Sequence, residues 1–145
     1  MTISGPFYGY VGPSHFSLTI QSEMKHFGKE LGALGERLAV DAIQQRGLDI
    51  LARNWRCPLG EIDIIARDRE TLVIIEVKTR RGRAAGTPEQ GVDRRKQRKL
   101  CELAQCYVEN IGWEGAVRLD VVGVEFSSSG KLLRVTHWPG AVECW

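Results

Sequence analysis

The feature that most constrains this chain is a pair of apolar segments in its middle that carry charges at regular positions. The stretch GEIDIIARDRETLVIIEVKTRR, residues 60–81, contains two runs rich in Ile and Val, Glu61 to Ala66 and Leu72 to Thr79, separated by RDRET. Such runs around a polar turn predict two strands joined as an exposed hairpin. Charges inside strands this apolar require a physical reason.

The register of the predicted hairpin brings two of these charges together. Side chains alternate between the faces of a strand. With a four-residue loop, Arg67 pairs with Leu72, and Asp63 then lies directly opposite Glu76. Opposed side chains have Cβ atoms about 4.5–5.5 Å apart, and like charges at that distance are destabilising. The two carboxylates therefore need a proton or a cation beside them.

A divalent metal is the simplest such cation. Carboxylate oxygens favour Mg²⁺ or Mn²⁺ over zinc or copper. Lys78 follows Glu76 on the same face and falls opposite Glu61 in this register. A metal beside a lysine can activate water and stabilise charge on a phosphodiester. The alternative is a surface ladder in which Glu61 pairs with Lys78 while Asp63 and Glu76 reach solvent.

The rest of the chain predicts an α/β fold, a mixed β-sheet flanked by helices, because one helix separates the third strand from the fourth and can serve as a crossover. Glu36 lies at the edge of the apolar stripe of the first helix. We treat residues 1–26 as an N-terminal extension and 27–145 as one domain. The further predicted elements are a helix over His26–Arg46, a strand over 48–55, a helix starting at Thr87 or Asp93 and ending near Asn110, and strands over 116–126 and 131–138.

Charge is distributed unevenly along the chain. The net charge is +2, but the segment Lys78–Lys99 holds nine basic residues against two acidic ones. A basic segment on a mildly acidic body is expected of a protein that binds a polyanion through one face. The alternative is a solvated basic loop and helix.

The cysteines and histidines argue against a zinc site. The four cysteines form no CxxC pair, and the three histidines stand far apart. We find neither a signal peptide nor an apolar stretch long enough for a membrane span. We therefore predict a cytoplasmic protein with reduced thiols and no contact with membranes.

Three segments, in this order and spacing, closely resemble the YraN family of bacterial proteins: LGERLAVDAIQQRGLDILARNWRCPLGEIDIIARD, IIEVKTRR and VDRRKQRKLCELAQCYV. Asp63, twelve intervening residues and Glu76-Val77-Lys78 resemble the PD-(D/E)XK signature of restriction-endonuclease-like nucleases, with Ile62 where the usual proline stands. The chain is also similar, more distantly, to archaeal Holliday-junction resolvases. The resemblance covers roughly residues 27–138.

This resemblance implies roles for individual residues. Asp63 and Glu76 would bind Mg²⁺ or Mn²⁺ with the backbone carbonyl of Val77, and Lys78 would be the catalytic lysine. Glu36 matches a first-helix glutamate that joins the site in resolvase-like members. Glu61 would lie outside the metal's immediate ligands or pair with Lys78.

The predicted function is a metal-dependent nuclease that cleaves DNA, with RNA a weaker candidate. The absence of an added recognition module, together with basic residues suited to phosphates, favours structure-selective cleavage. The alternative is a non-catalytic nucleic-acid-binding or scaffold protein. Resolvase-like relatives imply a homodimer, and we interpret Arg118 and Asp120 as a structural ion pair. The residues predicted to contact nucleic acid are Arg80, Arg94, Lys96, Gln97 and Lys99.

Overall fold

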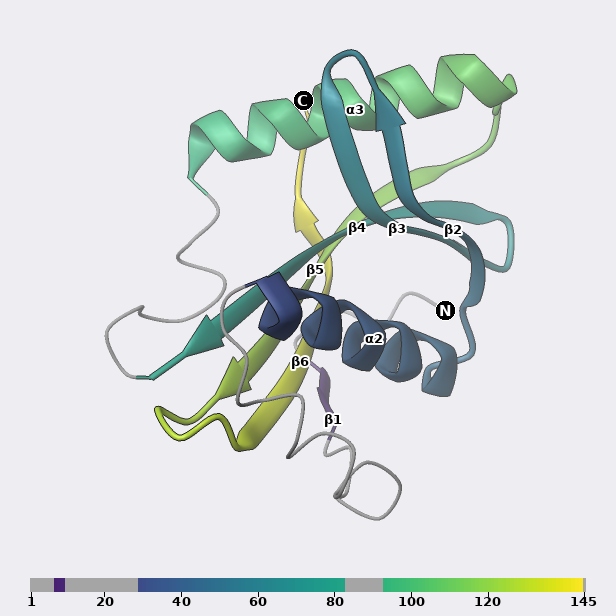
Figure 1. The fold of residues 1–145 in the computed structure, drawn as a ribbon. Coiled ribbons are helices and arrows are strands. Elements are labelled where there is room, and N and C mark those ends of the chain that lie inside the picture. Colours follow the sequence, from purple (N-terminus) through teal and green to yellow (C-terminus); the bar gives the residue numbers. More distant parts are fainter. Residues whose placement is uncertain (1–6, 10–28, 83–92, 145) are drawn as a thin grey trace.

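The computed structural model describes residues 7–9, 29–82 and 93–144, which form one six-stranded sheet with two helices (Figure 1). The strand order is β1-β6-β5-β4-β3-β2. The elements are β1 (Phe7–Gly9), α2 (Lys29–Gln45), β2 (Asp49–Cys57), β3 (Gly60–Asp68), β4 (Thr71–Arg81), α3 (Arg94–Ile111), β5 (Val117–Phe126) and β6 (Leu132–Val142).

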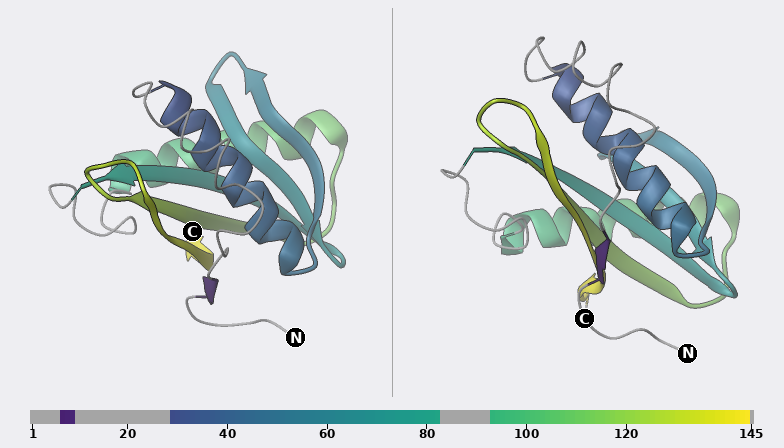
Figure 2. Two further views of the ribbon diagram at one scale, coloured as in Figure 1. Left: turned by 60° about the horizontal axis from the view of Figure 1, so that its bottom comes forward. Right: turned by 90° about the horizontal axis from the view of Figure 1, so that it is seen from below.

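The sheet is mixed, as the sequence predicts. β4 and β5 pair in parallel, and the other neighbouring strands pair antiparallel. The parallel pair is joined through α3, the predicted crossover helix. The two helices cover opposite faces of the sheet (Figure 2). The α/β fold of restriction-endonuclease-like type is therefore confirmed.

Each helix builds its own hydrophobic core. Apolar residues of α2, among them Leu34, Leu38 and Ile43, pack on one face of the central strands, and those of α3, Leu100, Leu103, Ala104 and Tyr107, pack on the other. Leu72 to Ile75 of β4 are fully buried, since their alternate side chains enter the two cores. Burying one large aliphatic side chain contributes about 1.5–3 kcal/mol, so β4 is the strand on which both cores depend.

A glycine allows α2 to lie very close to β4. A Cβ atom added to Gly35 would overlap Oγ1 of Thr79. Only a residue without a side chain permits this approach of helix backbone to strand. The contact places the next residue, Glu36, beside the charged end of β4.

The start of α3 follows one of the two predicted alternatives. Asp93 caps the helix, and its Oδ1 accepts a hydrogen bond from the Lys96 amide at 2.9 Å. The other proposed cap, TPEQ at 87–90, lies outside the described residues. The basic residues from Arg94 to Lys99 therefore occupy the first turns of α3, where free backbone N–H groups add positive potential.

β6 is longer than predicted. The expectation that it ends at Trp138 is wrong, because the strand continues through Pro139 and Gly140 to Val142. Its register against β5 shifts here, and Gly140 adopts a φ of 63°. Such an irregularity accommodates a proline without ending the strand.

The hairpin register is confirmed over most of its length. Arg67 pairs with Leu72, although the strands extend further than predicted and leave only Arg69 and Glu70 in the turn. At the other end, pairing stops at Ile64 and Ile75. Beyond this point β3 leaves β4 and, together with β2, leans against α3 (Figure 1). The two strands thus separate, and we call the space between them the fork. The expected direct pairing of Asp63 with Glu76 does not form.

The prediction that all thiols are reduced is wrong, because Cys101 of α3 and Cys144 form a disulfide bond with their Cα atoms 5.5 Å apart. The spacing of 43 residues gave no sign of this pairing, which forms because Cys144, just after the end of β6, reaches α3. Neither helix in the described part of the chain is apolar enough to cross a membrane.

Candidate active site

Asp63 occupies the fork between β3 and β4. Its Oδ2 accepts a hydrogen bond from the Val77 amide at 2.8 Å. The Asp63 carboxylate thus accepts a hydrogen bond from a backbone amide of β4 where the pairing of β3 with β4 has ended. This bond fixes Asp63 beside Glu76 and Lys78, although the backbones have separated.

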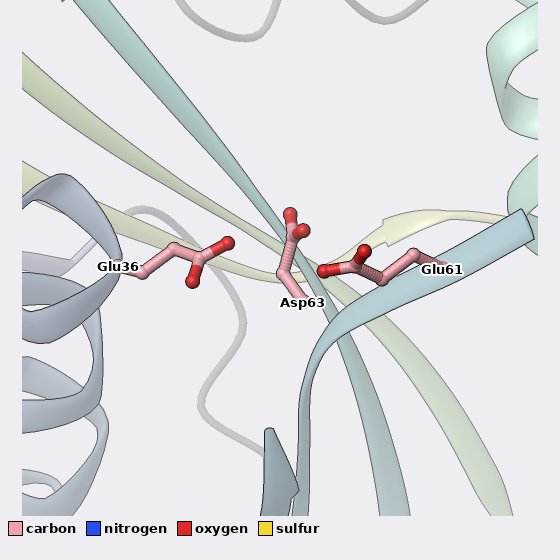
Figure 3. A group of neighbouring side chains, drawn as sticks. All are labelled: Glu36, Glu61 and Asp63. Carbon is pink, nitrogen blue, oxygen red and sulfur yellow. The ribbon is translucent and has the colours of Figure 1, made fainter. Parts of the chain in front are cut away.

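Three carboxylates converge at this fork. Oxygens of Glu36, Glu61 and Asp63 all lie within 4.8 Å of one another. Figure 3 shows Glu36 reaching from α2 on one side, Glu61 reaching from β3 on the other and Asp63 standing between them. The donors in this group are all carboxylate oxygens, which suits a hard divalent cation.

The electrostatics of the site show that the charges of Asp63 and Glu36 are incompletely compensated. Burial, and next to it the charge of Glu76, raises the pKa of Asp63 from 3.8 to about 7. Burial also raises the pKa of Glu36, with Glu61 adding to the rise and Arg53 opposing it. A cation bound here would replace the proton that Asp63 otherwise retains near neutral pH.

Glu76 and Lys78 form the second part of the site. The Lys78 ammonium lies 3.2 Å from Oε1 of Glu76, and both side chains are partly buried. The alternative in which Lys78 pairs with Glu61 is wrong, because Lys78 pairs with Glu76 and Glu61 pairs with Arg56, at 3.1 Å. The separation of β3 from β4 explains the change of partner.

Asn54 is a site residue that the sequence did not reveal. It lies in β2 between Arg53 and Trp55, which pair with Ile64 and Ile62 on either side of Asp63. Oriented to donate, its amide nitrogen lies 3.0 Å from Glu61 and 3.0 Å from Glu36. Its φ of 53° is a left-handed conformation that Asn tolerates better than most residues. The one available signal was an Asn inside a strand, where that residue is uncommon.

A cavity of about 240 Å³ connects the fork to α3. Lys96 and Lys99 line it together with Lys78, so three of the predicted basic residues share one surface with Glu61 and Glu76. The complete lining is Gly60, Glu61, Glu76, Lys78, Lys96, Lys99, Leu100 and Leu103. A phosphate group entering this cavity would meet carboxylates on one wall and ammonium groups on the other.

The remaining predicted phosphate-binding residues do not line this cavity. Arg94 is exposed at the start of α3, and Gln97 is half-buried on the same helix. Arg80 is half-buried on β4, and within the described ranges its buried Nε has no hydrogen-bond partner. Lys96 and Lys99 are therefore the predicted phosphate-binding residues that share a cavity with Glu61 and Glu76.

A second buried carboxylate, Asp120, has a different environment. Arg118 binds it through two hydrogen bonds of 2.9 and 3.0 Å, which confirms the interpretation of this pair as structural. His137 Nε2 lies 2.7 Å from the same carboxylate, and the Gly140 amide donates to it at 2.9 Å. Arg46 contacts the other ring nitrogen of His137 at 2.8 Å. Burial would raise the pKa of Asp120, but these hydrogen bonds lower it.

Comparison with known proteins agrees with the resemblance found in the sequence. Residues 35–124 match the model of the family described as "Uncharacterised protein family UPF0102". A UPF0102 protein from Dictyoglomus thermophilum is 42% identical over 106 residues, which cover 72% of this chain and 90% of the relative. A UPF0102 protein from Mycobacterium ulcerans is 46% identical over 115 residues, covering 77% and 93%. One from Mycolicibacterium vanbaalenii is 47% identical over 112 residues, covering 77% and 92%.

The matched segment contains the elements that build the fork. It runs from Gly35 at the α2–β4 contact to Val124 in β5 and includes every carboxylate of the cluster. The chain belongs to the UPF0102 (YraN) family, within the PD-(D/E)XK-like nuclease superfamily.

Proposed function

We propose that this protein is a metal-dependent nuclease that hydrolyses phosphodiester bonds of DNA. The observation that carries the proposal is the convergence of Glu36, Glu61 and Asp63 beside the Glu76–Lys78 pair. Such a cluster is costly without a cation, and a lysine at its edge suits chemistry on an anionic substrate.

The residues present fit a divalent metal. Glu36, Glu61 and Asp63 would hold Mg²⁺ or Mn²⁺, and Glu76, whose charge acts on Asp63, borders the same site. The proposed ligand set from the family resemblance, Asp63, Glu76 and the Val77 carbonyl, overlaps this group. When bound, such an ion polarises a phosphate oxygen and lowers the pKa of an attacking water.

The chain's own side chains would divide the remaining tasks. Lys78, held by Glu76, places a positive charge where the phosphate gains negative charge. Asn54 holds Glu36 and Glu61 at a fixed separation. Lys96 and Lys99 would bind backbone phosphates on the α3 side of the cavity.

The charge distribution favours selection of DNA by its structure. The described cations of α3 are placed for phosphates, and phosphate contacts position a nucleic acid without reading its sequence. The limited volume of the cavity between the fork and α3, about 240 Å³, also favours a strand that can bend or separate over an intact rigid duplex. We therefore propose junctions, flaps or single strands as substrates, with a homodimer as the assembly for junctions.

The test is cleavage of labelled DNAs, namely duplex, single strand, flap and four-way junction, in Mg²⁺, Mn²⁺ or EDTA. We expect metal-dependent products with the wild-type chain and none with Glu76→Ala, which serves as the control for contaminating nucleases. Lys78→Ala should retain metal binding and lose turnover. Binding of DNA without cleavage in either metal would refute the nuclease and favour the non-catalytic nucleic-acid-binding alternative.

A further inference from the structure

The tip of the β2–β3 hairpin rests against the middle of α3. Trp55 and Tyr107 pack edge to face with ring centroids 5.1 Å apart. On the other side of the tip, a Cβ atom at Gly60 would lie 3.5 Å from Lys99 and 3.6 Å from Leu103. These contacts join segments that lie far apart in the chain and fix the hairpin on the helix.

Two cysteines face each other between these contacts. Cys57 follows Trp55 at the end of β2, and Cys106 precedes Tyr107 on α3. Each thiol acts on the pKa of the other, both are half-buried, and neither belongs to a disulfide. The contacts of Trp55 with Tyr107 and of Gly60 with Leu103 would keep the two cysteines near each other when the hairpin moves.

The surroundings give the two thiols unequal acidity. Burial tends to raise the pKa of Cys57, but hydrogen bonds from the Leu59 backbone, the Cys106 thiol and the Gly60 backbone, with the charge of Lys99, lower it. The pKa of Cys106 is raised, first by its hydrogen bond with Cys57 and then by burial. Cys57 is thus the thiol that ionises first and attacks an oxidant, while Cys106 is placed to resolve the product.

We propose that Cys57 and Cys106 form a redox-active dithiol that closes to a second disulfide when it meets a low-molecular-weight disulfide. The Cys57 thiolate attacks one sulfur of glutathione disulfide, forming a mixed disulfide and releasing one glutathione thiolate. Cys106, deprotonated, then attacks the sulfur of Cys57 and releases the second glutathione. The protein loses two hydrogens and is oxidised, and one glutathione disulfide is reduced to two glutathione molecules.

The bond would act next to the carboxylate cluster. Gly60 and Glu61 follow Cys57 directly after the hairpin turn, and both line the cavity shared with Lys99 and Leu103 of α3. Closing the dithiol would covalently join the hairpin wall of this cavity to its helical wall. This property depends on the thiols alone and does not require the proposed nuclease activity.

The test uses the full chain, oxidised with glutathione disulfide, alkylated and digested without reduction. We expect a peptide pair linked through Cys57 and Cys106, in addition to the Cys101–Cys144 pair, together with the loss of two alkylatable thiols. Reduction by dithiothreitol should restore both. Thiols that stay free, or that each carry glutathione without a Cys57–Cys106 link, would overturn the proposal.

Single variants test the assigned order. Cys106→Ser should trap a glutathione adduct on Cys57, because the resolving thiol is absent. Cys57→Ser should acquire an adduct on Cys106 at least several-fold more slowly at the same pH. Equal rates, or faster modification of Cys106, would contradict the roles, and circular dichroism of each variant would verify that the fold is retained.

Discussion

Asp63 and Asp120 are both inward-facing carboxylates of the same sheet, and they differ in opposite ways from an ordinary aspartate. The side chain of Asp120 is 0% exposed, yet its pKa is lowered. Asp63 is less deeply buried, and its pKa rises to about 7. Depth of burial therefore does not decide the charge state of these two groups.

The difference lies in the partners. Asp120 receives hydrogen bonds from the Arg118 guanidinium, His137 and a backbone amide, so its charge is fully compensated. The neighbours of Asp63 are mostly other carboxylates, with the Val77 amide as its donor. A buried charge with enough partners stabilises the fold, whereas a cluster of incompletely compensated carboxylates indicates a site that binds a cation.

Of the changes that remove one of these two charges, a substitution of Asp63 should have the largest effect, and that effect is on DNA cleavage. Asp63→Asn keeps the size of the side chain but removes a metal ligand and one source of repulsion. We expect DNA cleavage to fall by about 10²–10⁴-fold, the equivalent of several kcal/mol of transition-state stabilisation. Urea unfolding in EDTA at pH 8 should show unchanged or increased stability. If Asp63→Asn were inactive only because it is less stable, Asp63 would have a structural role like that of Asp120, and the proposed difference between the two residues would be wrong.

The converse change should affect stability. Asp120→Ala leaves Arg118 and His137 buried without their common partner, and we expect a loss of about 3–5 kcal/mol in the free energy of unfolding. Chemical denaturation followed by tryptophan fluorescence measures it. Glu125→Ala, which breaks the pair with the largely exposed Arg134, is the matched control and should cost less than about 1 kcal/mol. Equal losses for both variants would show that Asp120 is not special.

The two carboxylates should also respond to pH in opposite directions. Because the folded-state pKa of Asp63 is raised to about 7, the folded chain keeps a proton that the unfolded chain has released. Stability of the metal-free protein should therefore fall as pH rises from about 4 to 7, by about 2–4 kcal/mol. The raised pKa of Glu36 acts in the same direction. Asp120, with a lowered pKa, loses its contribution only as pH falls below about 4.

Unfolding curves in EDTA between pH 4 and 8 measure this dependence. Asp63→Asn should flatten the decline, since the titrating group is gone. Added Mg²⁺ should stabilise the wild type more at pH 8 than at pH 5, because the ligands must lose their protons to bind it. A decline of the same size in wild type and Asp63→Asn would assign it to other groups.

The smallest effect concerns Asn54, which supports the carboxylates from the β2 side. Asn54→Gly keeps the left-handed backbone accessible and removes only the amide, so we expect Mn²⁺ affinity to drop by about 10–100-fold. Asn54→Ala should add a stability loss of about 1 kcal/mol, because alanine disfavours this φ. Calorimetric titration of Mn²⁺ into both variants separates the two effects. Unchanged affinity in the glycine variant would leave Asn54 with a purely conformational role.

Local pattern predicted much of the fold and part of the site. The pairing of Arg67 with Leu72 followed from strand alternation, and the buried stripe of α3 followed from helical spacing. Alternation assumes that strands stay paired, however, and β3 leaves β4 just before Asp63. This is why the sequence correctly placed Asp63 near Glu76 but set Lys78 opposite Glu61, whereas Lys78 pairs with Glu76.

Other contacts were beyond any local pattern. Arg46 and His137 meet across 91 residues, and Asn54 joins the cluster through a backbone conformation that its neighbours do not encode. The extension of β6 past Pro139 depends on an irregular pairing with β5, which only the assembled sheet determines. Periodicity thus identifies elements and their faces, while forks and irregular pairings decide where charged groups meet.

The close seating of Gly35 on Thr79 gives the cluster a stiffness that its side chains could not provide. Glu36 follows this contact directly, so its Cα is positioned by a backbone resting on a strand. The buried packing of Leu34, Leu38 and Ile43 keeps α2 on the sheet, which opposes an outward movement that would relieve the crowding of negative charge. The carboxylates therefore stay close together in the metal-free protein and attract a cation. The geometry of the binding site is already formed when the chain has folded.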